Sequence, residues 1–277
     1  MQRVFTITIL MIFLLARAGA QIMPEKDSQV YRLNRWVEIP VTAALFAGVQ
    51  LGLSHVQDKP VLDSAEISML NPHDIWKFDR RATMQDPSFR IQANHISDIV
   101  MNSTVVMPVF LLLDRKIRKD WIDFFILYAE AHAVSGVAYV GTASLYDRNR
   151  PFVYNSEIPA NDKMVTGTRN SFFSGHTSTT AVSSFFMAKV LSDYHPELGN
   201  KKYLLFAAAL VPPAIVGFYR YKAMKHYPTD ILMGLAVGAA TGILVPHFHK
   251  HGKKSTKVSF MPVGGAVNGF YLSYHLR

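Results

Sequence analysis

The sequence contains no cysteine among its 277 residues. Disulfide bonds, cysteine-ligated zinc and thiol catalysis are therefore excluded. Acidic residues are also scarce, because 20 Asp and Glu stand against 29 Lys and Arg and leave a net charge of +9. The basic residues are spread over all polar segments instead of forming one run, so no nucleic-acid partner is predicted. With 49% hydrophobic residues, this composition is more typical of a membrane protein.

The amino terminus has the pattern of a secretory signal peptide. Arg3 precedes an apolar stretch from Val4 to Ala16, and the small residues Ala18-Gly19-Ala20 come before Gln21. A basic start, a short apolar run and a small-residue cleavage site predict that residues 1–20 are removed on export. An uncleaved membrane anchor is the alternative.

Six apolar segments along the rest of the chain predict an all-α bundle. Several contain fewer than the about 20 apolar residues of a clean membrane span, so we expect a membrane-associated bundle whose depth in the membrane stays open. Within the third segment, Glu130 and His132 are interpreted as a structural polar pair, with a contact to the functional site as the alternative. The segments are Trp36–His55, Ile96–Leu113, Trp121–Leu145, Thr177–Leu191, Tyr203–Phe218 and Ile231–His247.

The parts between and after these segments carry their own signals. The polar segment Val56–His95 is too long for a turn and predicts short helices on a surface. In the last apolar segment, Gly234, Gly238 and Gly242 recur at every fourth residue, a spacing that favours close helix contact. Near the carboxy terminus, two short strands around a turn are predicted between Val258 and Tyr274.

Three polar stretches fall at junctions between the predicted helices. Asp147–Phe152 follows the third helix, Ser171–Thr177 precedes the fourth, and Gly217–Asp230 joins the fifth to the sixth. If neighbouring helices are antiparallel, all three junctions lie at the same end of the bundle. We therefore expect their side chains to form one site. Taken alone, the last stretch would also suit a basic loop at a membrane surface.

His226 and Asp230 are the candidates for nucleophilic chemistry. They lie four residues apart, and Pro228 between them is well placed to begin a helix. A carboxylate in that first turn can accept the proton of one imidazole nitrogen and leave the other nitrogen free as a nucleophile. The junction is expected to lie at the surface.

A phosphate group is the ligand that the remaining residues suit. Ser174 is a plausible helix N-cap, and Gly175 allows the backbone to approach a ligand closely. The N–H groups of that first helical turn form an anion site, to which Arg150 and Arg220 add charge-assisted hydrogen bonds. With His226 attacking phosphorus and His176 protonating the leaving oxygen, these residues predict phosphoryl transfer.

These residues resemble the three-part signature of the phosphatidic acid phosphatase type 2 superfamily, which includes vanadium-dependent haloperoxidases and bacterial acid phosphatases. The resemblance covers roughly Ile96 to His247. It implies a six-helix fold, no metal and no cofactor, and hydrolysis through a phosphohistidine on His226, with Asp230 orienting that ring and His176 as general acid. The matching residues are Arg150-Pro151, Ser174-Gly175-His176, and Arg220 with His226 and Asp230 at the family's spacing.

Three positions depart from the family pattern. The first part of the signature usually opens with a Lys seven residues before the Arg, and Ala143 stands there instead. Arg148 is the residue that we expect to supply the missing charge. Phe173 replaces the usual Pro, and Tyr219 replaces the usual Ser. Neither of these two replacements removes a member of the catalytic pair.

The leading hypothesis is a phosphatase of a lipid phosphate or diphosphate, such as undecaprenyl diphosphate, phosphatidylglycerophosphate, phosphatidic acid or a lipid A phosphate. The alternatives are a soluble acid phosphatase or haloperoxidase, and a non-catalytic lipid-binding protein of the envelope. We expect a bacterial envelope protein with a periplasm-facing site. The domain order is a signal peptide (1–20), an amino-terminal helix with a polar surface segment (21–95), the catalytic helical domain (96–250) and a carboxy-terminal tail (251–277).

Overall fold

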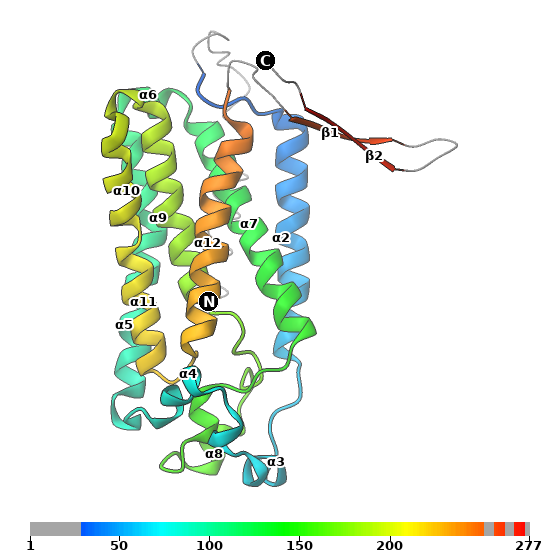
Figure 1. Ribbon diagram of the computed structural model, residues 1–277, viewed down its shortest axis with the longest axis vertical. Helices are drawn as coiled ribbons and strands as arrows, with labels where there is room; N and C mark the ends of the chain where they lie inside the picture. Colours follow the sequence, from blue (N-terminus) through cyan, green and yellow to red (C-terminus); the bar gives the residue numbers. More distant parts are fainter. Residues whose placement is uncertain (1–28, 252–257, 264–268, 275–277) are drawn as a thin grey trace.

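The computed structural model describes residues 29–251, 258–263 and 269–274. The predicted signal peptide, residues 1–20, lies outside the described residues. The chain forms an upright bundle of long helices, which confirms the predicted all-α fold (Figure 1). Its long helices are α2 (Arg35–Gln57), α5 (Arg90–Val106) continued by η5 (Met107–Leu113), α7 (Trp121–Leu145), α9 (Gly175–Tyr194), α10 (Lys202–Ala209) with α11 (Val211–Lys222), and α12 (Pro228–His249).

Short helices gather at the two ends of the bundle. Three of them, α3, α4 and α8, cover the end at which α12 begins (Figure 1). This arrangement confirms the prediction of short surface helices between the first two long ones. The short elements are α3 (Ser64–Met69), η2 (Pro72–Asp74), α4 (Lys77–Arg80), η3 (Arg81–Met84), η4 (Pro87–Phe89), α6 (Arg115–Lys119), η6 (Pro151–Tyr154), α8 (Ala160–Lys163) and η7 (Pro196–Lys201).

Two helix boundaries differ from the sequence prediction. Helix α5 begins at Arg90, before the predicted start at Ile96, and in its added first turns Ala93 is buried and Asn94 contacts Arg220. The fifth predicted helix is divided into α10 and α11 at Leu210. Pro212 and Pro213 follow immediately, and they lack the N–H groups that a continuous helix would need.

Helix α9 is the centre of the bundle, and most of its residues are buried. Helix α12 lies directly against it, as the glycine spacing predicts. A Cβ atom at Gly234 would lie 2.5 Å from the carbonyl oxygen of Ser174, and one at Gly238 would lie 2.2 Å from that of Ser178. The two backbones can approach this closely only because the glycines have no side chain.

Five helical stretches among the described residues are long and apolar enough to cross a membrane. Large apolar side chains are exposed on their outer faces, including Trp36, Leu51, Ile99 and Leu145. A bundle with this outer surface is stable when hydrocarbon, not water, covers it. The predicted membrane association is thereby confirmed. The five stretches are Arg35–Gln57, Pro87–Leu113, Trp121–Leu145, Pro196–Lys222 and Pro228–His249.

The carboxy-terminal tail forms the two predicted strands. Strand β1 (Val258–Val263) pairs antiparallel with β2 (Gly269–Tyr274), so that Val258 faces Tyr274. Tyr31, near the first described residue, forms an isolated bridge with Lys250 at the end of α12. The amino-terminal side of α2 and the carboxy-terminal end of α12 therefore lie together, opposite α3, α4 and α8 (Figure 1).

We predict that Gly238→Ala destabilises the protein by about 1–3 kcal/mol, because the new methyl group forces α9 and α12 apart. The measurement is the thermal unfolding midpoint in detergent. Gly141→Ala in α7 is the matched control, since nothing lies within 4 Å of a Cβ atom there. Equal midpoints for the two variants would contradict the close contact of α9 with α12.

Candidate active site

The three polar stretches meet at the end of the bundle covered by α3, α4 and α8. Backbone hydrogen bonds join them directly: the N–H of Phe152 donates to the carbonyl oxygen of Met224 at 3.1 Å, and the N–H of Ser174 donates to that of Asp230 at 2.9 Å. The first, second and third stretches are therefore parts of one structural unit. The helix count predicts this meeting, and the structure shows it.

The turn between α11 and α12 aims His226 into the bundle. Helix α11 ends in a Schellman motif, in which the N–H of Lys225 donates to the carbonyl oxygen of Arg220 and that of Met224 to Tyr221. Met224 takes the position that usually holds glycine and has a φ of 55°. Its side chain is fully buried against Leu62 and Phe152, which holds the residue in this unfavourable conformation.

His226 is buried, with 2% of its surface exposed, so the expectation of a surface junction is wrong. The reason is that the segment between α2 and α5 folds over this end of the bundle. The Nδ1 atom lies 2.7 Å from the carbonyl oxygen of Ser171. A carbonyl only accepts, so Nδ1 carries the proton and Nε2 holds the lone pair. Burial, together with Arg150 and Arg220, keeps the pKa of His226 well below its usual value, so the ring is neutral.

Asp230 lies beside this histidine but does not bond to it directly. Its Oδ2 atom is 3.8 Å from Nδ1 of His226. The same oxygen accepts hydrogen bonds from Oγ of Ser171 at 2.6 Å and from the N–H of Tyr227 at 2.9 Å. Asp230 therefore fixes Ser171, and Ser171 in turn fixes the imidazole tautomer.

Arg148 forms ion pairs with two carboxylates. It donates to Asp230 and, at 2.7 Å, to Oδ2 of Asp79, and it stacks over the ring of Tyr227. Asp79 is buried and also accepts from the N–H and hydroxyl of Thr229. In this arrangement Arg148 ties α4 to the start of α12 and does not supply the charge missing at Ala143.

Ala143 itself is fully buried. The ammonium group of Lys59 lies 2.5 Å from its carbonyl oxygen and 2.5 Å from Oδ1 of Asp147. Lys59 thus caps the carboxy-terminal end of α7 and forms an ion pair with Asp147.

The two predicted phosphate-binding arginines retain unsatisfied donors. Arg220 has 4% of its surface exposed and donates to Oδ1 of Asn94 at 2.8 Å, but its buried Nε has no hydrogen-bond partner in the described part of the chain. Arg150 donates through Nε to the carbonyl oxygen of Gly167 at 2.8 Å. Its two terminal nitrogens form no hydrogen bond with any residue that the structure describes. A buried unpaired donor on Arg220, together with the unpaired terminal nitrogens of Arg150, fits a site that binds an anion.

His176, in the first turn of α9, is paired with a carboxylate that the sequence did not predict. Its Nε2 atom lies 2.8 Å from Oδ1 of Asp98 in α5, and Asp98 also lies 3.8 Å from Arg220. Ser174 is the N-cap of α9, as predicted, and accepts from the N–H of Thr177. A Cβ atom at Gly175 would lie 3.2 Å from the ring of Tyr139, so this glycine allows close packing at the site.

One face of α5 carries site residues that the sequence analysis did not identify. Asn94, Ser97 and Asp98 are spaced so that they share a side of the helix, and all three contact Arg220 or lie near it. Their three- and four-residue spacing was the available signal, but the predicted helix began two residues after Asn94. Asp79 was missed because it belongs to no recognisable motif, and Ser171 was included only as the start of the second polar stretch, without a role.

Glu130 and His132 lie away from this site, as the structural interpretation predicts. His132 is 3.1 Å from the hydroxyl of Ser183 within the bundle. Glu130 faces the far end of α12, where Nε2 of His249 lies 3.7 Å from it and 3.4 Å from Glu38.

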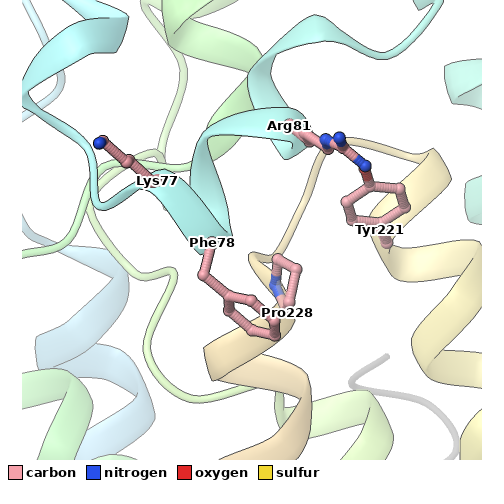
Figure 2. Close-up of a pocket in the computed structure, with 5 residues that line it drawn as sticks. All are labelled: Lys77, Phe78, Arg81, Tyr221 and Pro228. Carbon is pink, nitrogen blue, oxygen red and sulfur yellow. The ribbon is translucent and has the colours of Figure 1, made fainter.

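A cavity of about 460 Å³ opens beside the site, between α4, η3, α11 and the start of α12. Figure 2 shows the guanidinium group of Arg81 next to the ring of Tyr221, and the ring of Phe78 next to Pro228. Lys77 completes the lining. Neither Lys77 nor Arg81 has a side-chain hydrogen bond or ion pair with another described residue. An aromatic wall with cations at its edge suits an amphiphile with an acidic head group.

Comparison with known proteins identifies the domain. Residues 124–254 match the model of the PAP2 superfamily. This match confirms the resemblance predicted from the three motifs and the prediction of a phosphatase. Among solved structures, the chain is similar to a transmembrane PAP2-type phosphatidylglycerolphosphate phosphatase from Bacillus subtilis. The sequence identity is 20%, the match covers 75% of this chain and 94% of that one, and the TM-score is 0.43.

We predict that Asp98→Asn lowers kcat about 10- to 100-fold, because the imidazole of His176 loses the carboxylate that orients it. KM should not rise, since the lost negative charge lies 3.8 Å from Arg220 and would repel a bound phosphate. Steady-state kinetics with a phosphate ester in detergent measures both constants. A higher KM with unchanged kcat would show that Asp98 acts on binding and not on His176.

Proposed function

We propose that this protein with a PAP2 domain hydrolyses the phosphate monoester or diphosphate of a membrane lipid through a phosphohistidine on His226. The observation that carries the proposal is the set of unsatisfied arginine donors around a buried neutral histidine. Arg150 and Arg220 depress the pKa of His226, and among the described residues neither arginine is hydrogen-bonded to a carboxylate, since Asp98 lies 3.8 Å from Arg220. A phosphate dianion would satisfy these donors beside the nucleophile.

In the first step, the lone pair of Nε2 of His226 attacks phosphorus. The P–N bond forms as the bond from phosphorus to the leaving oxygen breaks, and His176 gives that oxygen a proton. The positive charge that develops on the imidazole is stabilised through Ser171, which accepts from Nδ1, and by Asp230 at 3.8 Å. Arg150 and Arg220 hold the oxygens on which negative charge accumulates.

In the second step, water attacks the phosphohistidine while His176 accepts its proton. The P–N bond breaks, inorganic phosphate is released and His226 returns to its neutral form. Each step uses groups of this chain alone, and the resemblance implies neither metal nor cofactor.

A lipid substrate is supported by the surroundings of the site. The candidate membrane-spanning helices α5, α11 and α12 all reach this end of the bundle, so an acyl or prenyl chain can lie against them while its head group meets Arg150 and Arg220. The apolar outer surface disfavours the soluble acid phosphatase. The presence of His176, His226 and Asp230 together disfavours a non-catalytic lipid-binding protein, which has no need for all three.

We further propose that the site faces the periplasm of a bacterial envelope. The connection at the opposite end, residues 114–120, carries Arg115, Lys116, Arg118 and Lys119 in a short loop between two candidate spans. Short loops rich in Lys and Arg stay on the cytoplasmic side. Because Tyr31 lies at that same end, this orientation requires that residues 1–20 do not act as a cleaved secretory signal if α2 crosses the membrane.

We predict that His226→Asn abolishes phosphate release while the protein remains folded. The amide of Asn can take the place of Nδ1 in the bond to Ser171, but no nucleophile replaces Nε2. The measurement is phosphate release from lipid phosphates and a soluble ester, in detergent with EDTA, together with acid-quench trapping of the labelled phosphoenzyme. Full turnover by the variant would exclude His226 as the nucleophile, and inhibition of the wild type by EDTA would exclude the metal-independent mechanism.

The orientation is testable because the chain has no cysteine of its own. Ser156→Cys places an exposed thiol at the site end, and Asn200→Cys places one at the opposite end. We predict that a membrane-impermeant maleimide labels the first variant in intact spheroplasts and the second only after lysis. The reverse pattern would place the site in the cytoplasm and support the cleaved signal.

A further inference from the structure

The phosphate site lacks the lysine that the family pattern provides. Ala143 stands at that position, Arg148 is bound to Asp79 and Asp230, and Lys59 is bound to Asp147. None of these cations is available to a phosphate. A cation that replaces this lysine must therefore be another residue near Arg150 and Arg220.

Lys225 is the cation that meets this requirement. It directly precedes His226, and its ammonium group lies 5.2 Å from the centre of the Phe152 ring. Phe152 follows the Arg150-Pro151 pair, so Lys225 bridges the first and third motifs. The guanidinium of Arg90, at the start of α5, lies 5.2 Å from the same ring. Aromatic faces attract cations and can hold both side chains without neutralising them.

The ammonium group of Lys225 has no hydrogen-bond or ion-pair partner among residues 29–251. The neighbouring Lys222 differs in this respect, since its Nζ donates to Oε1 of Gln85 at 2.9 Å. Burial, and to a smaller extent the charges of Arg150, Arg220 and Arg90, lower the pKa of Lys225 to about 7, whereas Asp98 opposes the shift. A half-buried cation near two arginines is electrostatically unfavourable, and a bound dianion would relieve the repulsion.

We propose that Lys225 is a further phosphate-binding residue, which donates to an oxygen of the same phosphate that Arg150 and Arg220 hold and so replaces the lysine absent at Ala143. The inference rests on the proposed function, because it assumes that these arginines bind the reacting phosphate. It assigns a role in binding the substrate to a residue outside the three-part signature.

The proposal has a consequence for the pH dependence of binding. Before phosphate binds, Lys225 is protonated below its pKa and loses its charge as the pH rises through it. Affinity for phosphate should therefore fall with rising pH beyond what the ionisation of phosphate itself explains. The charged groups that face Lys225 are Arg90 and Asp98 from α5, Arg150 from the loop after α7, and Arg220 from α11. The arginines keep their charge over this range, and substitution of Lys225 separates its titration from that of His176 and His226.

The test measures binding of inorganic phosphate to the purified full-length protein in detergent, by calorimetry, at a pH below and a pH above the pKa of Lys225. Three variants are compared with the wild type. Lys225→Met removes the charge and keeps the length of the side chain, Lys225→Arg keeps the charge at both pH values, and Lys222→Met is the matched control. Thermal unfolding of each variant verifies that it is folded.

Below the pKa, we expect Lys225→Met to bind phosphate about 10- to 100-fold more weakly than the wild type, as for loss of a charge-assisted hydrogen bond. Lys225→Arg should bind within about threefold of the wild type at the lower pH and more tightly than the wild type at the higher pH. Lys222→Met should match the wild type at both. The ionisation of phosphate is the same for all four proteins and cancels in the comparison.

Three results would overturn the inference: unchanged phosphate affinity in Lys225→Met, an equal loss in Lys222→Met, or no phosphate binding by the wild type. The first two would show that Lys225 does not contact the phosphate or contributes only to general surface charge. Because binding is measured without turnover, failure of the proposed hydrolysis appears separately. A wild type that binds phosphate through Lys225 but releases none from any lipid would retain this inference and lose the proposed reaction.

Discussion

The buried carboxylate of Asp230 is the interaction on which the site depends. It accepts from Ser171, from the N–H of Tyr227 and from Arg148. These partners come from the segment before α9, from the end of the loop after α11 and from the loop after α7. One side chain thus holds all three motifs in register, and the orientation of His226 follows from it. A buried carboxylate with three donors is satisfied, whereas the same group with one donor removed would be costly.

Unlike Asp230, the positively charged side chains at the site have few partners within the described part of the protein. Arg150, Arg220 and Lys225 lie near one another, and among the described residues the carboxylate nearest to Arg220 is Asp98 at 3.8 Å. Within the described part of the chain, the repulsion among these three cations is offset only in part, by Asp98. Close packing of α9 against α12 and the buried side chain of Met224 offset it. In the proposed reaction, a bound phosphate relieves this repulsion, and the energy released contributes to binding.

Local sequence signals predicted the elements that depend on local chemistry. The spacing of apolar residues gave the long helices, Pro228 marked the start of α12, and the strand pattern located β1 and β2. The helix count also predicted that the three motifs meet. The partners of the motif residues were not predictable, because Asp79, Asp98 and Ser171 reach the site through tertiary packing over long sequence separations. For the same reason, the partner of Arg148 could not be predicted from spacing alone. The sequence shows that Arg148 lies near Ala143, but not that it pairs with Asp79.

The bridge between Tyr31 and Lys250 brings the two ends of the helical domain together on the side of the bundle away from His226. Anything attached to either end, including the β1–β2 hairpin, is therefore separated from His226 by the full length of the bundle (Figure 1). Helix α12 is the direct mechanical link between the two sides, since it begins beside His226 and ends at Lys250. The glycine contacts with α9 leave little room for α12 to shift, so binding of a partner at the hairpin is expected to have little effect on the position of His226 through this helix.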